Sequence, residues 1–161
     1  DDMKLQLSDY SEIAGTTALE GSGIVIKIKD GYYDISESTS YEIDRRTLHA
    51  TDAALLINEL RAIGAEAIAI NGYRVLNDTG VQCEWAFIGF NDNNQTIEGQ
   101  PFYFYALGKP EELEAALFSD GSYLNRLIIR GLEIEVEKRE DLYFPPTNRI
   151  LDFQYMERAD S

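Results

Sequence analysis

The residues best suited to binding chemistry form the short segment Asn71-Gly72-Tyr73-Arg74. An Asn-Gly pair favours positive backbone φ angles and exposes amide N–H groups in a tight turn. The Arg74 guanidinium would then supply a planar fork of donors that matches a carboxylate or a phosphate. Together with Asn58, this turn could line a pocket for a small anion. The simpler alternative, favoured in so acidic a chain, is that Arg74 pairs with an internal carboxylate or carbonyl and stabilises the turn.

Two further residues have side chains that are used in catalysis. His49 could act as a general base with a nearby serine or Asp52, yet no G-x-S-x-G nucleophile motif occurs. Cys83 lies in an alternating pattern, where a buried thiol behaves as a small apolar side chain. A reactive thiol would need a cationic neighbour that lowers its pKa. The sequence therefore predicts a protein that is not an enzyme.

The sequence predicts neither a cofactor nor a metal. Gly21-Ser22-Gly23 resembles part of a dinucleotide loop, but that fingerprint needs a helix after it, and here a strand follows. Residues 91–95 have the composition of a calcium loop, without its glycine at the sixth position or its closing glutamate. Glu133, Glu135 and Glu137 share one strand face, which is typical of a solvated sheet surface.

The composition excludes several classes of function. The chain has 161 residues, of which 44% are hydrophobic and 27% charged, which is typical of one soluble globular domain. Its formal net charge of −15 repels phosphate backbones and anionic lipids, so no nucleic-acid binding is expected. A basic partner or divalent cations would be attracted, although solubility alone explains such a charge. The one cysteine and one histidine exclude an internal disulfide and a Cys/His zinc site.

The sequence contains no membrane-spanning segment, because no run approaches the roughly 18 apolar residues that a helical span needs. Asp1-Asp2-Met3-Lys4 is not followed by the apolar region of a signal peptide. Apolar residues instead recur at helical spacing, as at the end of a longer helix or coiled coil: Met3, Leu7, Tyr10 and either Ile13 or Ala14.

The elements that must position these residues are organised around a capped helix that leads directly into a strand. Thr51 or Asp52 is expected to cap the helix by accepting its first N–H groups. Its buried stripe comprises Ala53, Leu56, Ile57, Leu60 and Ile63. Gly64 ends the helix, and residues 65–70 form a buried strand. An earlier alternating strand at residues 24–28 completes a strand–helix–strand unit, whose two strands should lie parallel in one sheet.

The remaining segments add a loop, three strands and two helices. Residues 32–48 show no clear period and are expected to form a long loop or mobile insert. The other expected elements are a strand at 83–88, a turn at 91–95, a hairpin partner strand at 102–107, a helix starting at Pro110, a helix between Ser122 and Gly131, and a strand at 132–136.

This order predicts an α+β fold of the ferredoxin-like (split βαβ) type, with a mostly antiparallel sheet, helices on one face and an extra hairpin strand. The other face of the sheet would be open to a partner. Residues 1–18 are expected to end an N-terminal helix or linker, residues 19–146 to form a single α+β domain, and residues 147–161 to form a C-terminal tail.

Several motifs resemble, in order, the bacterial domain-of-unknown-function family numbered 881, over residues 14–146. The most specific of them is G-A-E-A-I-x-I-N-G-x-R at residues 64–74. Supporting segments are residues 19–26, 52–60, Cys83, 113–117 and 131–137. The chain departs from the family pattern in a longer hairpin at 91–100 and a tyrosine-rich strand at 102–105.

The resemblance implies an envelope protein of Gram-positive type. Members typically carry an N-terminal membrane helix and a coiled coil, place this domain outside the cytoplasm, and are often encoded near cell-division genes. We therefore expect a non-catalytic, extracytoplasmic interaction or scaffold domain, attached to the membrane only through an N-terminal anchor absent from this chain. Its expected partners are envelope or division proteins, with self-association through an N-terminal coiled coil. The alternative is a small anionic-ligand sensor domain that uses Asn58, Asn71, Gly72 and Arg74.

Overall fold

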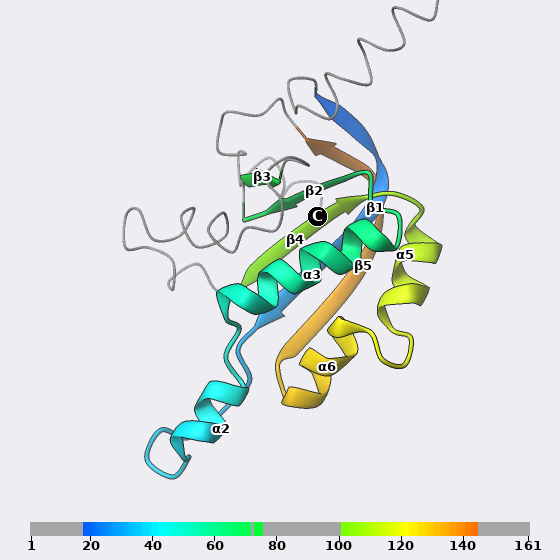
Figure 1. Ribbon diagram of the computed structural model, residues 1–161. Coiled ribbons are helices and arrows are strands. Elements are labelled where there is room, and N and C mark those ends of the chain that lie inside the picture. Colours follow the sequence, from blue (N-terminus) through cyan, green and yellow to red (C-terminus); the bar gives the residue numbers. More distant parts are fainter. Residues whose placement is uncertain (1–17, 72, 76–100, 145–161) are drawn as a thin grey trace, which may run out of the picture.

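The computed structural model describes residues 18–71, 73–75 and 101–144. Within these residues, five strands form one antiparallel sheet in the order β3-β2-β4-β1-β5 (Figure 1). The strands are β1 (Leu19–Lys29), β2 (Ala67–Ile70), β3 (Tyr73–Val75), β4 (Phe102–Leu107) and β5 (Glu133–Phe144). The fold is therefore α+β, as the sequence predicts.

The first two strands confirm the predicted strand–helix–strand unit. β1 and β2 both pair antiparallel with β4, so they run parallel to each other with β4 between them. β1 is bonded to β4 on one side and to β5 on the other. Its alternating isoleucines suit this central position, because Ile24, Ile26 and Ile28 are fully buried on one face.

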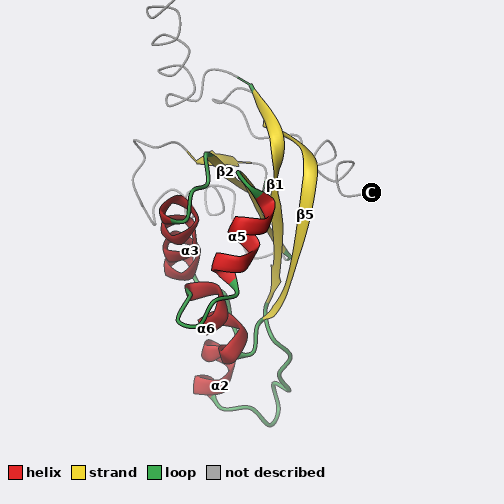
Figure 2. Ribbon diagram, turned by 90° about the vertical axis from the view of Figure 1, so that its right-hand side faces the viewer, coloured by secondary structure: helices red, strands yellow, loops and turns green. Residues whose placement is uncertain are grey.

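One face of the sheet is covered by helices (Figure 2). They are α3 (Ala50–Ala62), α5 (Pro110–Leu117) and α6 (Tyr123–Arg130). Pro110 begins α5, where its missing N–H is of no consequence, and the Ser122 hydroxyl caps α6. Gly131 ends α6 with a φ of 102°, in the left-handed region that favours glycine. These starts and stops confirm the predicted ones.

Apolar side chains pack on both faces of the sheet. The larger cluster lies under the helices and includes Leu56, Leu60 and Leu124 together with the isoleucines of β1. Since successive strand residues point to opposite faces, the neighbouring residues belong to a second cluster on the other face. That cluster comprises Val25, Ala69, Tyr105, Leu107, Leu142 and Phe144.

The start of α3 differs from the prediction. The helix begins at Ala50 with His49 as its N-cap residue, rather than Thr51 or Asp52. Asp52 is the third helical residue, and its carboxylate accepts the His49 backbone N–H at 2.8 Å. Asp52 is 3% exposed, so its side chain points into the interior of the domain. There it also accepts hydrogen bonds from Tyr123 and Arg130.

Residues 30–48, which we call the arm, contain a helix where the sequence predicts only a loop. This helix is α2 (Ser40–Arg45), and a capping box holds its start. Thr39 Oγ1 accepts the Glu42 N–H at 3.1 Å, and the Glu42 carboxylate accepts the Thr39 N–H at 3.2 Å. The prediction of a long loop or mobile insert is wrong for residues 40–45, because a helix this short shows no hydrophobic period. The arm projects from the end of the domain at which α3 begins (Figure 1).

Several predicted features lie outside the described residues. They are the helix at 3–14, the strand at 83–88 with Cys83, the turn at 91–95 and the tail at 147–161. The strand predicted at 132–136 corresponds to β5, which begins at Glu133 and continues to Phe144.

Candidate functional site

The predicted Asn-Gly turn joins β2 to β3. Ile70 and Tyr73 pair across the hairpin, and Asn71 between them has the expected positive φ, 45°; Gly72 lies outside the described residues. Asn71 Oδ1 accepts the Tyr103 N–H at 2.7 Å, and the Asn71 N–H donates to the Tyr103 carbonyl at 3.0 Å. Asn71 therefore extends the pairing of β2 with β4, which is a structural role.

The structure does not bring Asn58 and Arg74 together. Arg74 lies opposite Ala69 in the register of β2 and β3, so its side chain shares the face that carries the second apolar cluster. Asn58 lies on α3, which covers the other face. Arg74 is 7% exposed and already has an interaction partner, which favours the alternative that it stabilises the turn. Asn58 and Arg74 therefore lie on opposite faces of the sheet.

His49 lies at the surface beside Asp44. Its Nε2 is 3.3 Å from an Asp44 carboxylate oxygen and 3.0 Å from the Asp44 carbonyl oxygen. Their side chains are 40% and 73% exposed, so water screens the pair. The exposed position of His49 does not favour it as a catalytic base.

Among residues 18–71, 73–75 and 101–144, no group of three or more His, Cys, Asp or Glu side chains is placed to hold a metal.

A buried ionic network joins Asp52 of α3 to Arg130 of α6. Arg130 donates to both oxygens of the Asp52 carboxylate, at 2.7 and 3.2 Å. The Tyr123 hydroxyl donates to the same carboxylate at 2.5 Å, and the His49 N–H at 2.8 Å. Each oxygen of Asp52 thus accepts two hydrogen bonds. Two-point contacts between arginine and a carboxylate are among the stronger hydrogen-bonded pairs in proteins.

The same guanidinium also holds the arm. Arg130 Nε donates to the Arg45 carbonyl and Arg130 Nη2 to the Thr47 carbonyl, both at 2.8 Å. Because its donors and acceptors are engaged with one another, this network is suited to structure rather than to proton transfer. It fixes the end of the arm against α3 and α6. Sequence reasoning missed this role, since Asp52 and Arg130 are 78 positions apart.

Hydrogen bonding sets the protonation state of the network. Burial raises the pKa of the Asp52 carboxyl, but hydrogen bonds from Arg130, Tyr123 and the His49 N–H outweigh burial, so this pKa lies below its usual value. Burial and the hydrogen bond to Asp52 raise the pKa of Tyr123 to about 12. At neutral pH Asp52 is therefore ionised and Tyr123 is protonated.

The Tyr123→Phe variant removes one donor from this network. Loss of a hydrogen bond to a charged acceptor should lower the free energy of unfolding by about 1.5–3 kcal/mol at neutral pH. Because folding raises the pKa of Tyr123 from 10.0 to about 12, this contribution is complete below the first value and is lost as the pH rises through the second. Urea denaturation across that alkaline range should show the two proteins converging. A constant difference would contradict the assignment.

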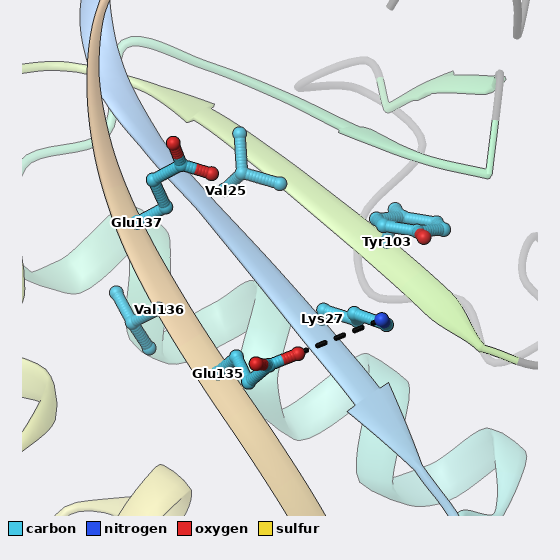
Figure 3. Close-up of a pocket in the computed structure, with 6 residues that line it drawn as sticks. All are labelled: Val25, Lys27, Tyr103, Glu135, Val136 and Glu137. Carbon is cyan, nitrogen blue, oxygen red and sulfur yellow. Dashed lines mark ion pairs between the residues drawn. The ribbon is translucent and has the colours of Figure 1, made fainter. Parts of the chain in front are cut away.

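A groove of about 340 Å³ is lined by residues of β4, β1 and β5, on the sheet face that bears the second apolar cluster (Figure 3). Its lining includes Val25, Lys27, Tyr103, Glu135 and Glu137. Lys27 Nζ is 3.5 Å from the carboxylate of Glu135, which lies directly across from it in the β1–β5 register. Opposite charges placed in this way stabilise a sheet, so the pair of Lys27 and Glu135 has a structural role.

The arm exposes large apolar side chains. Tyr32 is 82% exposed, Ile35 78% and Tyr41 72%. The helix α2 buries none of its own residues. Burying such side chains is favourable by about 1.5–3 kcal/mol each, so this exposure calls for an explanation.

The sequence signal that could have indicated the helix α2 is the T-x-x-E capping-box pattern at Thr39 and Glu42.

The base of the arm is nevertheless well ordered. The Gly31 N–H donates to the Arg46 carbonyl at 2.8 Å. The Leu48 N–H donates to the Asp30 carboxylate at 2.9 Å, and Leu48 packs against the larger core cluster. The exposed side chains are therefore carried by a backbone whose base is fixed by hydrogen bonds, which we call the frame of the arm.

Comparison with known proteins identifies the family. The family model described as "Bacterial protein of unknown function (DUF881)" matches residues 6–157. This chain belongs to the DUF881 family. The DUF881 chain is similar to the UPF0749 protein YlxW of Bacillus subtilis (strain 168), with 25% identity over 141 residues. That match covers 85% of this chain and 57% of YlxW, so the chain spans little more than half of that relative.

A solved structure shares the fold of this DUF881 chain. It is the crystal structure of an uncharacterized conserved protein from Mycobacterium tuberculosis, with a TM-score of 0.62 and 23% sequence identity. The likeness covers 93% of this chain and 96% of that one. In the part of the DUF881 chain that the structure describes, no helix has the length and apolar character to cross a membrane.

Proposed function

We propose that this DUF881 chain is a non-catalytic interaction domain of a membrane-anchored bacterial envelope protein, located outside the cytoplasm and assisting envelope or division assembly. The observation that carries the proposal is the arm, which presents Tyr32, Ile35 and Tyr41 to solvent on a hydrogen-bonded frame. Large exposed apolar side chains carried on one projecting segment are a feature of protein-interaction surfaces. The partners would be envelope or division proteins.

The protonation states of Asp52 and Tyr123 favour a structural role for their network over a catalytic one. A general acid or base works best with a pKa near the working pH. Within the network on α3 and α6, the pKa of Asp52 is lowered and that of Tyr123 is raised, both away from neutrality. Both groups are also hydrogen-bonded to each other. These features are typical of a structural network.

We also propose that the fold is of the ferredoxin-like (split βαβ) type, with β3 as the extra hairpin strand. Without β3, the sheet order is β2-β4-β1-β5. The inner strands are then the first and third in the chain, and the outer strands the second and fourth. The helices follow the first and third of these strands, which supports two interleaved βαβ units.

Capture from membranes tests the interaction role. The immobilised chain would be incubated with detergent-solubilised membranes of the bacterium that encodes it. We expect wild type to retain envelope or division proteins and the Ile35→Ser/Tyr41→Ser variant to lose them. Phe118→Ser is the matched control, because Phe118 is 47% exposed but follows α5. Recovery of cytosolic metabolic enzymes alone would contradict the proposal.

Protease treatment of cells tests the compartment. The full-length protein would carry an epitope tag at this domain, and intact protoplasts would be exposed to a protease. Digestion of the tagged domain is the expected result for an extracytoplasmic location. Protection until the membrane is lysed would place the domain in the cytoplasm and refute that part of the proposal.

A further inference from the structure

We infer that the arm binds a cationic amphipathic segment of a partner protein, with apolar side chains on one side and lysine or arginine on the other. This inference rests on the proposed function and names the chemistry of its partner. It combines three features of the arm, namely the exposure of its apolar side chains, its own net negative charge and the hydrogen bonds that hold its backbone.

The end of α6 carries a further exposed apolar side chain and lies beside the arm. Among the described residues, the four large apolar side chains with the highest exposed fractions are Tyr32, Ile35, Tyr41 and Ile129, the last at 66%. Arg45 Nη2 donates to the Ile129 carbonyl at 3.4 Å, which places the end of α6 beside α2 (Figure 2). Tyr41 and Arg45 are four positions apart on α2 and so share one face. The most exposed apolar side chains therefore gather at one end of the domain.

The arm that carries Tyr32, Ile35 and Tyr41 is acidic. The arm contains five carboxylates and two guanidinium groups, a net charge of −3: Asp30, Asp34, Glu37, Glu42, Asp44, Arg45 and Arg46. Every carboxylate except that of Asp30 belongs to an exposed residue, whereas both arginines are half-buried. Arg46 Nη1 is directed to the Tyr32 carbonyl at 3.2 Å, as Arg45 is to Ile129. Lysine and arginine of a partner would meet complementary charge, which favours encounter and orientation.

The arm is ordered before it meets a partner. The Asp34 carboxylate accepts the Ser36 N–H at 2.9 Å and the Ser36 hydroxyl at 2.7 Å, which fixes the turn that carries Ile35. The capping box fixes α2 and with it Tyr41. A surface that is already folded loses little conformational entropy on binding. The frame therefore favours recognition by a preformed apolar surface.

Two other occupants match this surface less well. An anionic bilayer would be repelled by the carboxylates of the arm that carries Tyr32, Ile35 and Tyr41. A second copy of this chain would bring two acidic arms face to face, and like charges at such an interface are unfavourable. A basic segment is the occupant that satisfies both the apolar and the acidic parts of the surface.

Calorimetric titration of the whole chain with a short amphipathic peptide of leucine and lysine tests the inference. We expect the Ile35→Ser/Tyr41→Ser variant to bind at least about tenfold more weakly. Glu37→Lys should weaken binding about threefold or more, because it reverses one exposed charge of the arm. Phe118→Ser should remain within about twofold of wild type. The matched peptide of leucine and glutamate should not bind.

Four results would overturn the inference. They are equal weakening by Phe118→Ser, binding of the leucine–glutamate peptide as tight as that of the lysine peptide, arm-dependent binding to phosphatidylglycerol vesicles, and self-association that Ile35→Ser/Tyr41→Ser abolishes in sedimentation. If membrane capture still depended on the arm, the proposed function would stand and only the partner chemistry would be wrong. Unfolding curves of each variant would verify that it is folded.

Discussion

Replacing Arg130 with methionine is expected to lower the free energy of unfolding by about 3–5 kcal/mol. The Asp52 side chain is 4% exposed, and the variant would leave its carboxylate buried without the guanidinium that contacts both of its oxygens. Methionine retains an apolar stem, so the loss reports mainly the missing charge. Urea denaturation at neutral pH measures the effect.

The Asp52→Asn/Arg130→Met double variant is the control. Because an amide carries no charge, this variant should be more stable than Arg130→Met alone. Folding lowers the pKa of Asp52, so the contribution of the pair is complete above 3.8, the usual value, and is lost as the pH falls through the lower folded-state value. Wild type and Arg130→Met should therefore converge in acid. A loss below about 1 kcal/mol at neutral pH, as for a surface pair, would contradict the role of the network.

Replacing Gly31 with alanine is expected to lower the free energy of unfolding by about 1–3 kcal/mol and to displace the arm. A β-carbon at position 31 would overlap the Gly131 carbonyl oxygen and lie 3.3 Å from the Arg46 β-carbon. The backbone at position 31 would have to move away from Gly131. This movement would break the hydrogen bond from the Gly31 N–H to the Arg46 carbonyl. Thermal denaturation measures the stability. Amide hydrogen exchange at Leu48 measures the loosening of the arm.

The Gly64→Ala variant separates crowding from backbone strain. No atom lies within 4 Å of a β-carbon at position 64, whereas the φ of Gly64 is +110°. This variant should therefore lose about 1 kcal/mol through its backbone conformation alone, with slow exchange retained at Leu48. Equal acceleration of exchange at Leu48 in both variants would show that the close approach of Gly31 to Gly131 does not hold the arm.

Elements with their own short-range signals are predictable from the sequence. Pro110 at the start of α5, Ser122 before α6 and Gly131 after it each act on the backbone within one turn. The alternating isoleucines of β1 likewise specify a strand whose one face is buried. In these cases the local chemistry and the tertiary structure agree.

Features created by distant residues are not predictable in this way. Asp52 looks like a helix cap when only its neighbours are considered, because the partner that buries it lies on α6. The strand β3 has three residues, which is too short for a periodic pattern. The helix α2 has six, and only its capping box marks it in the sequence.

The candidate turn is predictable in conformation but not in role. Asn71 has the positive φ that an Asn-Gly pair favours. The face of the sheet on which Arg74 lies is decided by its register against Ala69, which three strand residues cannot specify. The arm escapes prediction as a site for a related reason, because Tyr32, Ile35 and Tyr41 follow no single period.

Photocrosslinking from position 41 in living cells tests most directly the claim that the arm is the interaction surface. A photoreactive residue would replace Tyr41 in the full-length protein, and in a matched strain it would replace Phe118. We predict a crosslink between position 41 and an envelope protein, and none from position 118. A crosslink from position 118 with none from position 41, at equal abundance of folded protein, would contradict that claim.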